Sequence, residues 1–226
     1  MKWQDNGFLL SINKYNENSS IAEFFTLSHG KASGIIFGST SKKIKSYLLI
    51  GNNLYLNYSS RNDTAIGNFK VEIESPNTAF FLDDKIKLNC IIYSMQIIKI
   101  ICVENQKNEK IFYLINSLFE ILKHDDWVRR YIFWELDLLK LQGYEINFKT
   151  YVEKIEKDGS LSFYSKTDKK KKIPNFLVDT NADCNRSELS LAFNIIGDFI
   201  NKSILNDNSL LIPNSRIELS KQLNNL

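Results

Sequence analysis

Apolar and polar residues alternate with a period of two along much of the first eighty residues. The pattern is clearest where Phe69, Val71 and Ile73 are separated by charged side chains, shortly before Pro76. Such alternation is typical of strands that bury one face. It predicts strands over 8–13, 21–27, 32–37, 54–58 and 69–73, with turns at 16–19, 29–31 and 61–64. Five short strands at hairpin spacing indicate a small barrel, and the OB-fold is a five-stranded barrel with a face that binds oligonucleotides.

After Pro76 the apolar residues recur at helical spacing instead. We predict helices over 83–103, 111–122, 127–142, 187–205 and from 214 to the end, with a polar, β-leaning stretch between the third and the fourth. The expected fold class is therefore α+β. An OB-fold barrel over 1–78 would precede a helical bundle domain over 79–226, which carries the insert at about 144–173.

Basic residues gather in the barrel half. Between Lys31 and Lys70 six basic side chains face one carboxylate, Asp63, although the net charge of the whole chain is only +3. Hydroxyl and ammonium groups bind phosphate oxygens, and a glycine such as Gly38 lets a backbone approach a ligand. The run after Gly38 is interpreted as a phosphate-binding loop. The candidate nucleic-acid-binding residues are Lys31, Ser39, Ser41, Lys42, Lys43, Lys45, Tyr47, Tyr55 and Arg61.

The tyrosines enter this set because aromatic rings stack on bases. Phe37 and Tyr58 share a face with apolar neighbours and are assigned to the core, whereas Tyr47 and Tyr55 are expected to be exposed. The alternative reading of the basic run is a solvated lysine surface. A second lysine run, 169–172, is the next place to look for a DNA contact.

The composition indicates which broad class of protein this is, but it does not identify the function. A hydrophobic content of 43% with 24% charged residues suits a soluble globular protein, and a pI near 8.6 permits a polyanionic partner. Three widely spaced cysteines suggest neither disulfides nor a zinc site. The N-terminus has no apolar signal core, and the longest apolar run, 90–103, is too short to span a bilayer. These features predict a cytoplasmic protein without a membrane partner.

A search for catalytic groups finds little. His29 and His124 are far apart in sequence, and His124-Asp125-Asp126 fits a helix cap better than a metal site. The run after Gly38 lacks the Gly-Lys-Ser/Thr ending of a nucleotide-binding loop. Glu135 lies among apolar positions, where a carboxylate needs partners, so we expect it to lock the bundle through hydrogen bonds. We predict no catalytic residue, no metal and no cofactor.

The chain resembles the RecO family of recombinational DNA repair proteins along nearly its whole length. The resemblance rests on the order and spacing of several short motifs. They are Trp3-x-Asp5-x-Gly7, Tyr15-x-Glu17-x-Ser19, Phe25-Thr26-x-x-His29-Gly30-Lys31, Gly38-x-x-Ser41-Lys42-Lys43, Leu49-x-Gly51-Asn52, Trp134-Glu135-Leu136-x-Leu138-Leu139-x-x-x-Gly143-Tyr144 and Pro213-x-Ser215-Arg216.

The resemblance implies a non-enzymatic, nucleoid-associated mediator that binds single- and double-stranded DNA and anneals strands coated with single-stranded-DNA-binding protein. It implies that RecR is a partner, that RecA is loaded with its help, and that the helical part binds the acidic tail of the coating protein. For the tail contact we expect Trp127, Arg130, Trp134 and Leu138.

Two departures from the family pattern limit these expectations. Many relatives carry paired cysteines in the insert, where this chain has none, so we expect no zinc. Relatives often have arginine where this chain has Phe133, and Arg130 is the expected substitute. Two alternatives from other classes stay open: an OB-type RNA-binding module, and a protein-binding adaptor whose lysines are only solvated surface.

Overall fold

A computed structural model describes residues 1–62, 65–157, 160–166 and 171–225 of the chain. It divides into two compact units, residues 1–120 and 121–226, which are considered separately. The expected boundary between the barrel domain and the helical domain, near residue 78, does not coincide with the boundary between these units. It stays a prediction.

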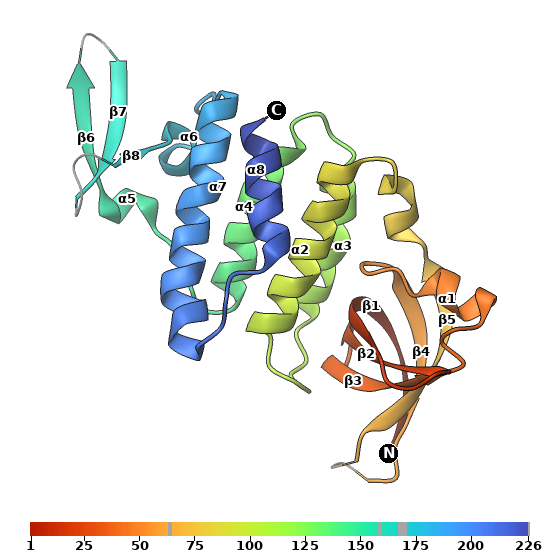
Figure 1. Cartoon of the computed structure of the whole chain (residues 1–226). Coiled ribbons are helices and arrows are strands. Elements are labelled where there is room, and N and C mark those ends of the chain that lie inside the picture. The colour runs from red at the N-terminus through yellow and green to blue at the C-terminus, as the bar shows by residue number, and fades with distance from the viewer. Residues whose placement is uncertain (63–64, 158–159, 167–170, 226) are drawn as a thin grey trace. The chain divides into compact units, whose positions relative to one another are not determined.

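The first unit begins with a closed barrel of five strands, which confirms the predicted fold class (Figure 1). Around the barrel the strands follow the order β1-β2-β3-β5-β4, and β3 and β5 run parallel while the other neighbours are antiparallel. This five-stranded Greek-key closure is the OB-fold arrangement. The strands are β1 (Lys2–Lys14), β2 (Ser19–Thr26), β3 (Gly30–Phe37), β4 (Asn53–Ser59) and β5 (Gly67–Ser75).

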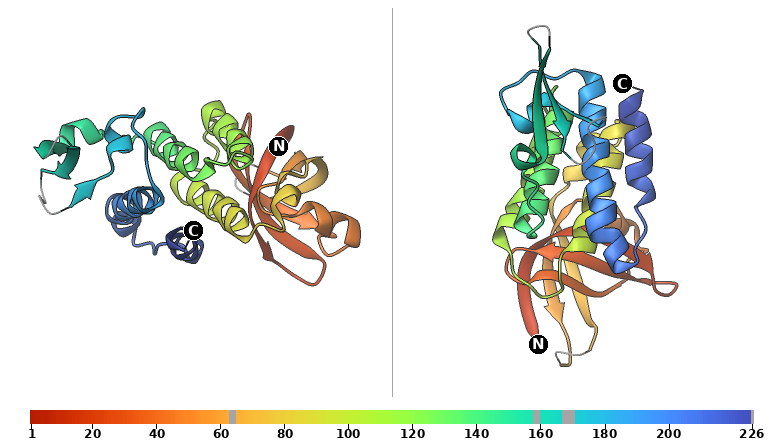
Figure 2. Two further views of the ribbon diagram at one scale, coloured as in Figure 1. Left: turned by 90° about the horizontal axis from the view of Figure 1, so that it is seen from above. Right: turned by 90° about the vertical axis from the view of Figure 1, so that its left-hand side faces the viewer.

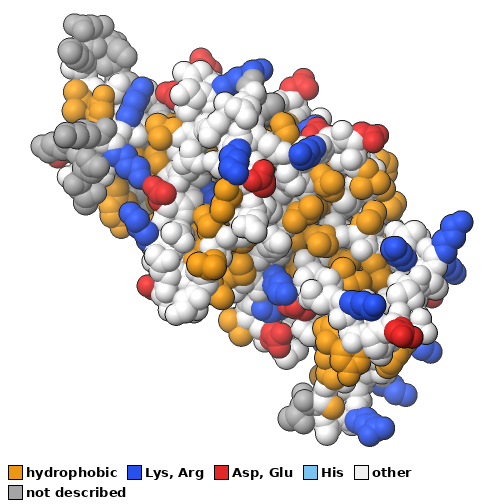
Figure 3. All heavy atoms as spheres, viewed as in Figure 1, with side chains coloured by type: hydrophobic (Ala, Val, Ile, Leu, Met, Phe, Trp, Pro, Cys, Tyr) orange, Lys and Arg blue, Asp and Glu red, His pale blue; other side chains and the backbone are white. Residues whose placement is uncertain are grey.

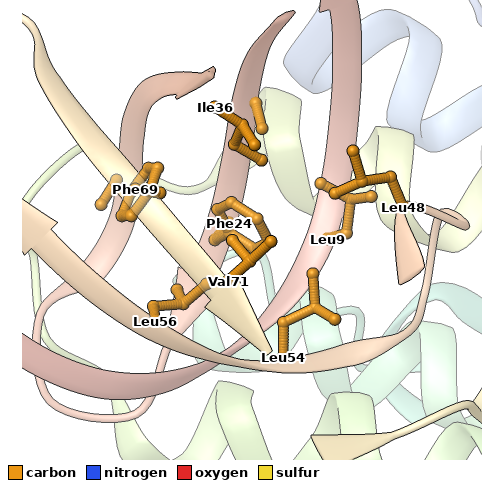
Figure 4. Close-up of a cluster of buried hydrophobic side chains, with 10 residues drawn as sticks. Leu9, Phe24, Ile36, Leu48, Leu54, Leu56, Phe69 and Val71 are labelled. Carbon is orange, nitrogen blue, oxygen red and sulfur yellow. The ribbon is translucent and has the colours of Figure 1, made fainter. Parts of the chain in front are cut away.

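The alternating apolar residues fill the barrel. Leu9, Phe24, Leu54 and Leu56 are fully buried in one cluster, and Phe69 packs edge-on against the Phe24 ring (Figure 4). Burying one such side chain contributes roughly 1.5–3 kcal/mol, so the cluster is the main force that closes the barrel.

Strand β1 starts six residues earlier than the alternation predicted. Its first residues pair with β4, from Lys2 opposite Ser59 onward. The pattern is hidden because Asp5 takes an inward position, where the structure buries it. Its Oδ2 accepts hydrogen bonds from the backbone N–H of Ser28 at 2.7 Å and contacts His29 Nδ1 at 2.9 Å, so the buried carboxylate is satisfied.

The second difference is that a short helix replaces the predicted loop. Helix α1 (Lys42–Tyr47) begins after Ser41, whose hydroxyl accepts a hydrogen bond from the backbone N–H of Ile44. The signal present in the sequence is an N-cap serine followed by apolar residues at helical spacing. The predicted loop is therefore wrong for residues 42–47.

The first unit is completed by η1 (Asn77–Phe81) and two longer helices, α2 (Lys85–Ile101) and α3 (Glu109–Ile121), close to the predicted ranges. Asp84 caps α2 by accepting from two backbone N–H groups. Phe8 points out of the barrel and packs against the rings of Phe112 and Phe119. The helices therefore cover the outer face of β1 at Phe8.

The second unit is built around α4 (Trp127–Leu141), α7 (Arg186–Ile200) and α8 (Asn214–Asn224). Figure 2 shows α7 and α8 running side by side, and α4 also packs against α7. A π-helical stretch, η2 (Asn201–Leu205), continues α7, and η3 (Asn206–Asn208) follows it. Asn185 and Glu188 form a capping box at the start of α7.

Glu135 has the structural role that the sequence predicted. Its carboxylate, fully buried, accepts two hydrogen bonds from the Arg216 guanidinium of α8. Arg216 also donates to the backbone carbonyl of Phe193 at 2.7 Å and lies over the Phe193 ring. One buried ion pair thus ties α4 and α8 together, and Arg216 extends the link to α7.

The insert forms a three-stranded antiparallel sheet of β6 (Val152–Lys157), β7 (Ser160–Ser165) and β8 (Lys172–Ile173). It lies between the short helices α5 (Phe148–Tyr151) and α6 (Asn175–Val178). This confirms its predicted β character. Half of the lysine run at 169–172 and part of the turn at 61–64 lie outside the described residues.

Candidate nucleic-acid interface

Helix α1 presents three lysines to solvent from one end of the barrel. Lys42, Lys43 and Lys45 are exposed, and among the described residues none of them has an ion-pair partner. On the opposite side of the helix, Ile44 and Tyr47 pack against the barrel core. The helix contains no acidic residue. Because its inner side is anchored, it holds three positive charges close together, and Figure 3 shows Lys and Arg side chains over this part of the barrel.

The β1–β2 turn is tied to the segment that leads into α1. The Ser20 and Ser39 hydroxyls are hydrogen-bonded at 2.8 Å, and the Ser39 backbone N–H donates to the Asn18 carbonyl. This contact brings the exposed Lys14, at the end of β1, to the same end of the barrel as α1. Sequence reasoning missed Lys14 because only the closed barrel places it there.

Three of the expected contact residues are engaged elsewhere. Ser39 is only 4% exposed and is bonded to Ser20, so its hydroxyl is not available to a phosphate. The Lys31 ammonium donates to the backbone carbonyl of Lys99 at 2.8 Å. Tyr47 is half-buried against the core rather than exposed. The exposure expected for Tyr47 was therefore wrong, and the contacts of all three residues stabilise the fold. A DNA contact of Lys31, which is half-buried, stays a prediction.

The remaining expected residues reach the surface in different places. Ser41 is exposed and caps α1, and Arg61 is exposed after the end of β4. Tyr55 is half-buried on β4 directly opposite Glu72, which places a carboxylate beside it. Phe37 corrects the opposite expectation, since it is 64% exposed at the end of β3. Phe37 is therefore a better candidate than Tyr47 for stacking on a base near α1.

Comparison with known proteins identifies the family. A family model described as "Recombination protein O N terminal" matches residues 1–76, and one described as "Recombination protein O C terminal" matches residues 82–195. The chain belongs to the RecO family of DNA repair proteins. The resemblance seen in the sequence is confirmed.

Curated relatives named DNA repair protein RecO include proteins from several bacteria. The one from Ehrlichia chaffeensis is 25% identical, and the alignment covers 98% of each chain. The one from Hyphomonas neptunium is 23% identical over 99% of this chain and 98% of the relative. The one from Cereibacter sphaeroides strain ATCC 17029 is 31% identical over 65% of this chain and 61% of the relative.

Helix α4 exposes fewer of the side chains expected to bind the acidic tail than the resemblance implied. Trp134 is 2% exposed and Leu138 is fully buried, so neither can contact a partner without opening the unit. Their expected contact role is corrected to a core role. Arg130 is exposed and pairs with Asp126 at 2.6 Å, an interaction that lowers the pKa of the Asp126 carboxyl. Asp126 is the N-cap residue of α4, as expected, but its side chain binds Arg130 and makes no capping hydrogen bond.

Trp127 borders a hollow in the second unit. The hollow, of about 380 Å³, lies where α4 and α7 begin, and its apolar lining includes Val128, Leu189 and Leu223. Arg129 lines it as well and donates to the backbone carbonyls of Thr180 and Ala182. Acidic side chains also line it: Asp125, Asp126 and Asp183.

Among the described residues of this RecO-family chain, no group of three His, Cys, Asp or Glu side chains is placed to hold a metal ion. The absence of zinc remains a prediction.

His29 is bonded to Asp5 and stacked on the Trp3 ring, with centroids 4.2 Å apart. In the described part of the chain, no helix is both long and apolar enough to cross a membrane.

Proposed function

We propose that this chain binds DNA through the α1 surface, defined as Lys42, Lys43 and Lys45 with Lys14 and Phe37 beside them. The observation that carries the proposal is the set of three α1 lysines, exposed and unpaired among the described residues on a helix whose other side is anchored in the barrel. Membership of a DNA repair family supports DNA as the polyanion.

Binding of this kind neutralises phosphates and reads no sequence. Each lysine–phosphate contact releases a condensed counterion, so affinity falls as salt rises. Phosphate contacts carry no base identity, and one exposed aromatic adds sequence-tolerant stacking. A protein that reduces the charge of two complementary strands in this way lets them approach. We propose that this chain is such a mediator and that it catalyses no bond change.

The partners proposed for the mediator are those implied by the family resemblance. RecR would act with the chain to load RecA, and the coating protein would bind through its acidic tail. For the tail we propose the hollow beside Trp127, where apolar residues and Arg129 and Arg186 lie together. Since Asp125, Asp126 and Asp183 share this hollow, the tail carboxylates would have to lie on its arginine side.

An annealing assay tests the proposed function. Complementary strands labelled for energy transfer are coated with the cognate single-stranded-DNA-binding protein, and the annealing rate is measured with and without the chain. We expect faster annealing with the natural protein and at least tenfold less acceleration with the K42A/K43A/K45A variant. The control K85A/K110A/K202A removes the same charge from exposed positions outside α1 and should anneal normally.

Two outcomes separate the alternatives. No acceleration by the natural protein contradicts the mediator role, and equal annealing by both triple variants contradicts the role of α1. Competition between a single-stranded DNA and an RNA of the same sequence tests the RNA-binding alternative, which predicts that RNA is preferred. An adaptor with solvated lysines would bind DNA weakly and with little dependence on salt.

A further inference from the structure

A second polar surface lies on the outside of the barrel, over the ends of three strands. The strand register arranges six outward side chains in two rows across β1, β4 and β5. These rows are Lys2, Ser59, Asn68 and then Gln4, Asn57, Lys70. The same residues line a shallow, open groove of about 650 Å³.

The chemistry of this groove is that of a phosphate and sugar site. The six outward side chains offer two ammonium groups, three amides and one hydroxyl. Trp3 and Tyr58 line the groove as well, and no carboxylate belongs to its described lining. Hydrogen bonds between Gln4 and Asn57 and between Ser59 and Asn68 hold the middle of the groove in place. Lysine, serine, asparagine and glutamine are the side chains that proteins use to contact a nucleic-acid backbone.

Acidic residues separate this groove from α1. The next row across the strands is Asn6, Tyr55 and Glu72, and Glu74 is the next outward residue of β5. Both glutamates are exposed, and α1 packs against β5. Two carboxylates on the strand that adjoins α1 repel a phosphate backbone at that place. The barrel therefore carries two cationic surfaces with acidic residues between them.

The two lysines of the groove start from well-separated places on the sheet. Lys2 and Lys70 are two strands apart and offset by two residues, which places their backbones on the order of 12 Å apart across the sheet. They can contact different phosphates of one strand while the amides between them bond to sugar and phosphate oxygens.

We propose that the groove defined by Lys2, Gln4, Asn57, Ser59, Asn68 and Lys70 binds a second single strand of DNA while the α1 surface holds the first. The proposal rests on the proposed function and extends it. With both surfaces occupied, one barrel brings two strands together and reduces the charge of each. Contacts from lysine to phosphate carry no base identity, so we expect the groove to accept strands of different sequence.

The test is the stoichiometry of a short oligonucleotide on the full chain. A short fluorescent thymidine strand of eight nucleotides is titrated at low salt, and the bound strands per chain are counted. The natural protein should bind two. The K2Q/K70Q variant and the K42A/K43A/K45A variant should each bind one, while K85Q/K110Q, a matched change of charge at exposed positions, should still bind two.

A charge-preserving variant, K2R/K70R, controls for folding and should keep both strands, and the urea midpoint of each variant should match that of the natural protein. A K2Q/K70Q variant that binds as many strands as the natural protein, with equal affinity, overturns the groove and leaves α1 untouched. If instead the α1 variant binds normally and the groove variant loses its strands, the groove stands and the proposed role of α1 fails.

Discussion

Removing Arg216 should destabilise the second unit more than any surface change can. Arg216→Ala deletes both hydrogen bonds to the Glu135 carboxylate and the bond to the Phe193 carbonyl, and it uncovers the Phe193 ring. Glu135 is fully buried and Arg216 is 3% exposed, so the carboxylate would lose its guanidinium partner in the interior of the unit. A buried charge that loses its partner costs about 3–5 kcal/mol. That range is comparable to much of the stability of a typical domain.

The measurement is urea unfolding of the full chain, followed by tryptophan fluorescence. Trp127 and Trp134 lie in the second unit and Trp3 in the first, so a Trp3→Phe background makes the signal specific for the second unit. The matched control is Arg186→Ala, which removes an exposed arginine from the same unit and should change stability by less than about 0.5 kcal/mol.

A double variant separates the ion pair from simple loss of packing. Glu135→Leu leaves a buried guanidinium and should also be strongly destabilising, but Glu135→Leu with Arg216→Met leaves no buried charge. The double variant should therefore lose about 2–3 kcal/mol less stability than the sum of the two single changes. A cost below about 1 kcal/mol for Arg216→Ala, or strictly additive effects, would refute the reasoning.

Three further predictions concern the turn, the thiols and the insert. Gly30 has φ +69°, and an added Cβ would lie 2.0 Å from the Gln106 carbonyl oxygen. Gly30→Ala should therefore lower the free energy of unfolding by at least about 2 kcal/mol, measured by urea unfolding. Burial raises the pKa of the Cys102 thiol to about 12. Iodoacetamide at pH 8 should therefore modify the half-buried Cys184 first and leave the buried Cys90 and Cys102 unmodified until urea is added. Early labelling of Cys102 would contradict this prediction. Since the insert has no cysteine, elemental analysis of the purified protein should find no stoichiometric zinc, and a chelator should leave its stability unchanged.

The fold was readable from the sequence where burial follows a strict period. Phe69, Val71 and Ile73 alternate on β5 as expected, and the helical stripes predicted α2, α3 and α4. The start of β1 was missed because buried Asp5, paired with His29, imitates a surface residue in the sequence. A pair such as Asp5 and His29, 24 residues apart in the sequence, forms only in the folded chain.

The candidate site was readable only as a region. The sequence located the basic stretch but gave it the wrong local structure, since Lys42, Lys43 and Lys45 lie on a helix and not in a loop. Residue type alone could not tell that the Ser39 hydroxyl is buried against Ser20. Contacts across the barrel decide which polar residues of such a stretch remain free to bind a ligand.

The central claim is that the α1 lysines contact DNA phosphates, and the salt dependence of binding tests it most directly. Fluorescence anisotropy of a labelled single strand at several salt concentrations gives the slope of log K against log salt. Replacing Lys42, Lys43 and Lys45 with Ala removes three contacts, each of which contributes about 0.7 to the slope, so the slope should become shallower by about 2. The K85A/K110A/K202A control should keep the natural slope. An unchanged slope in the folded α1 variant would contradict the account.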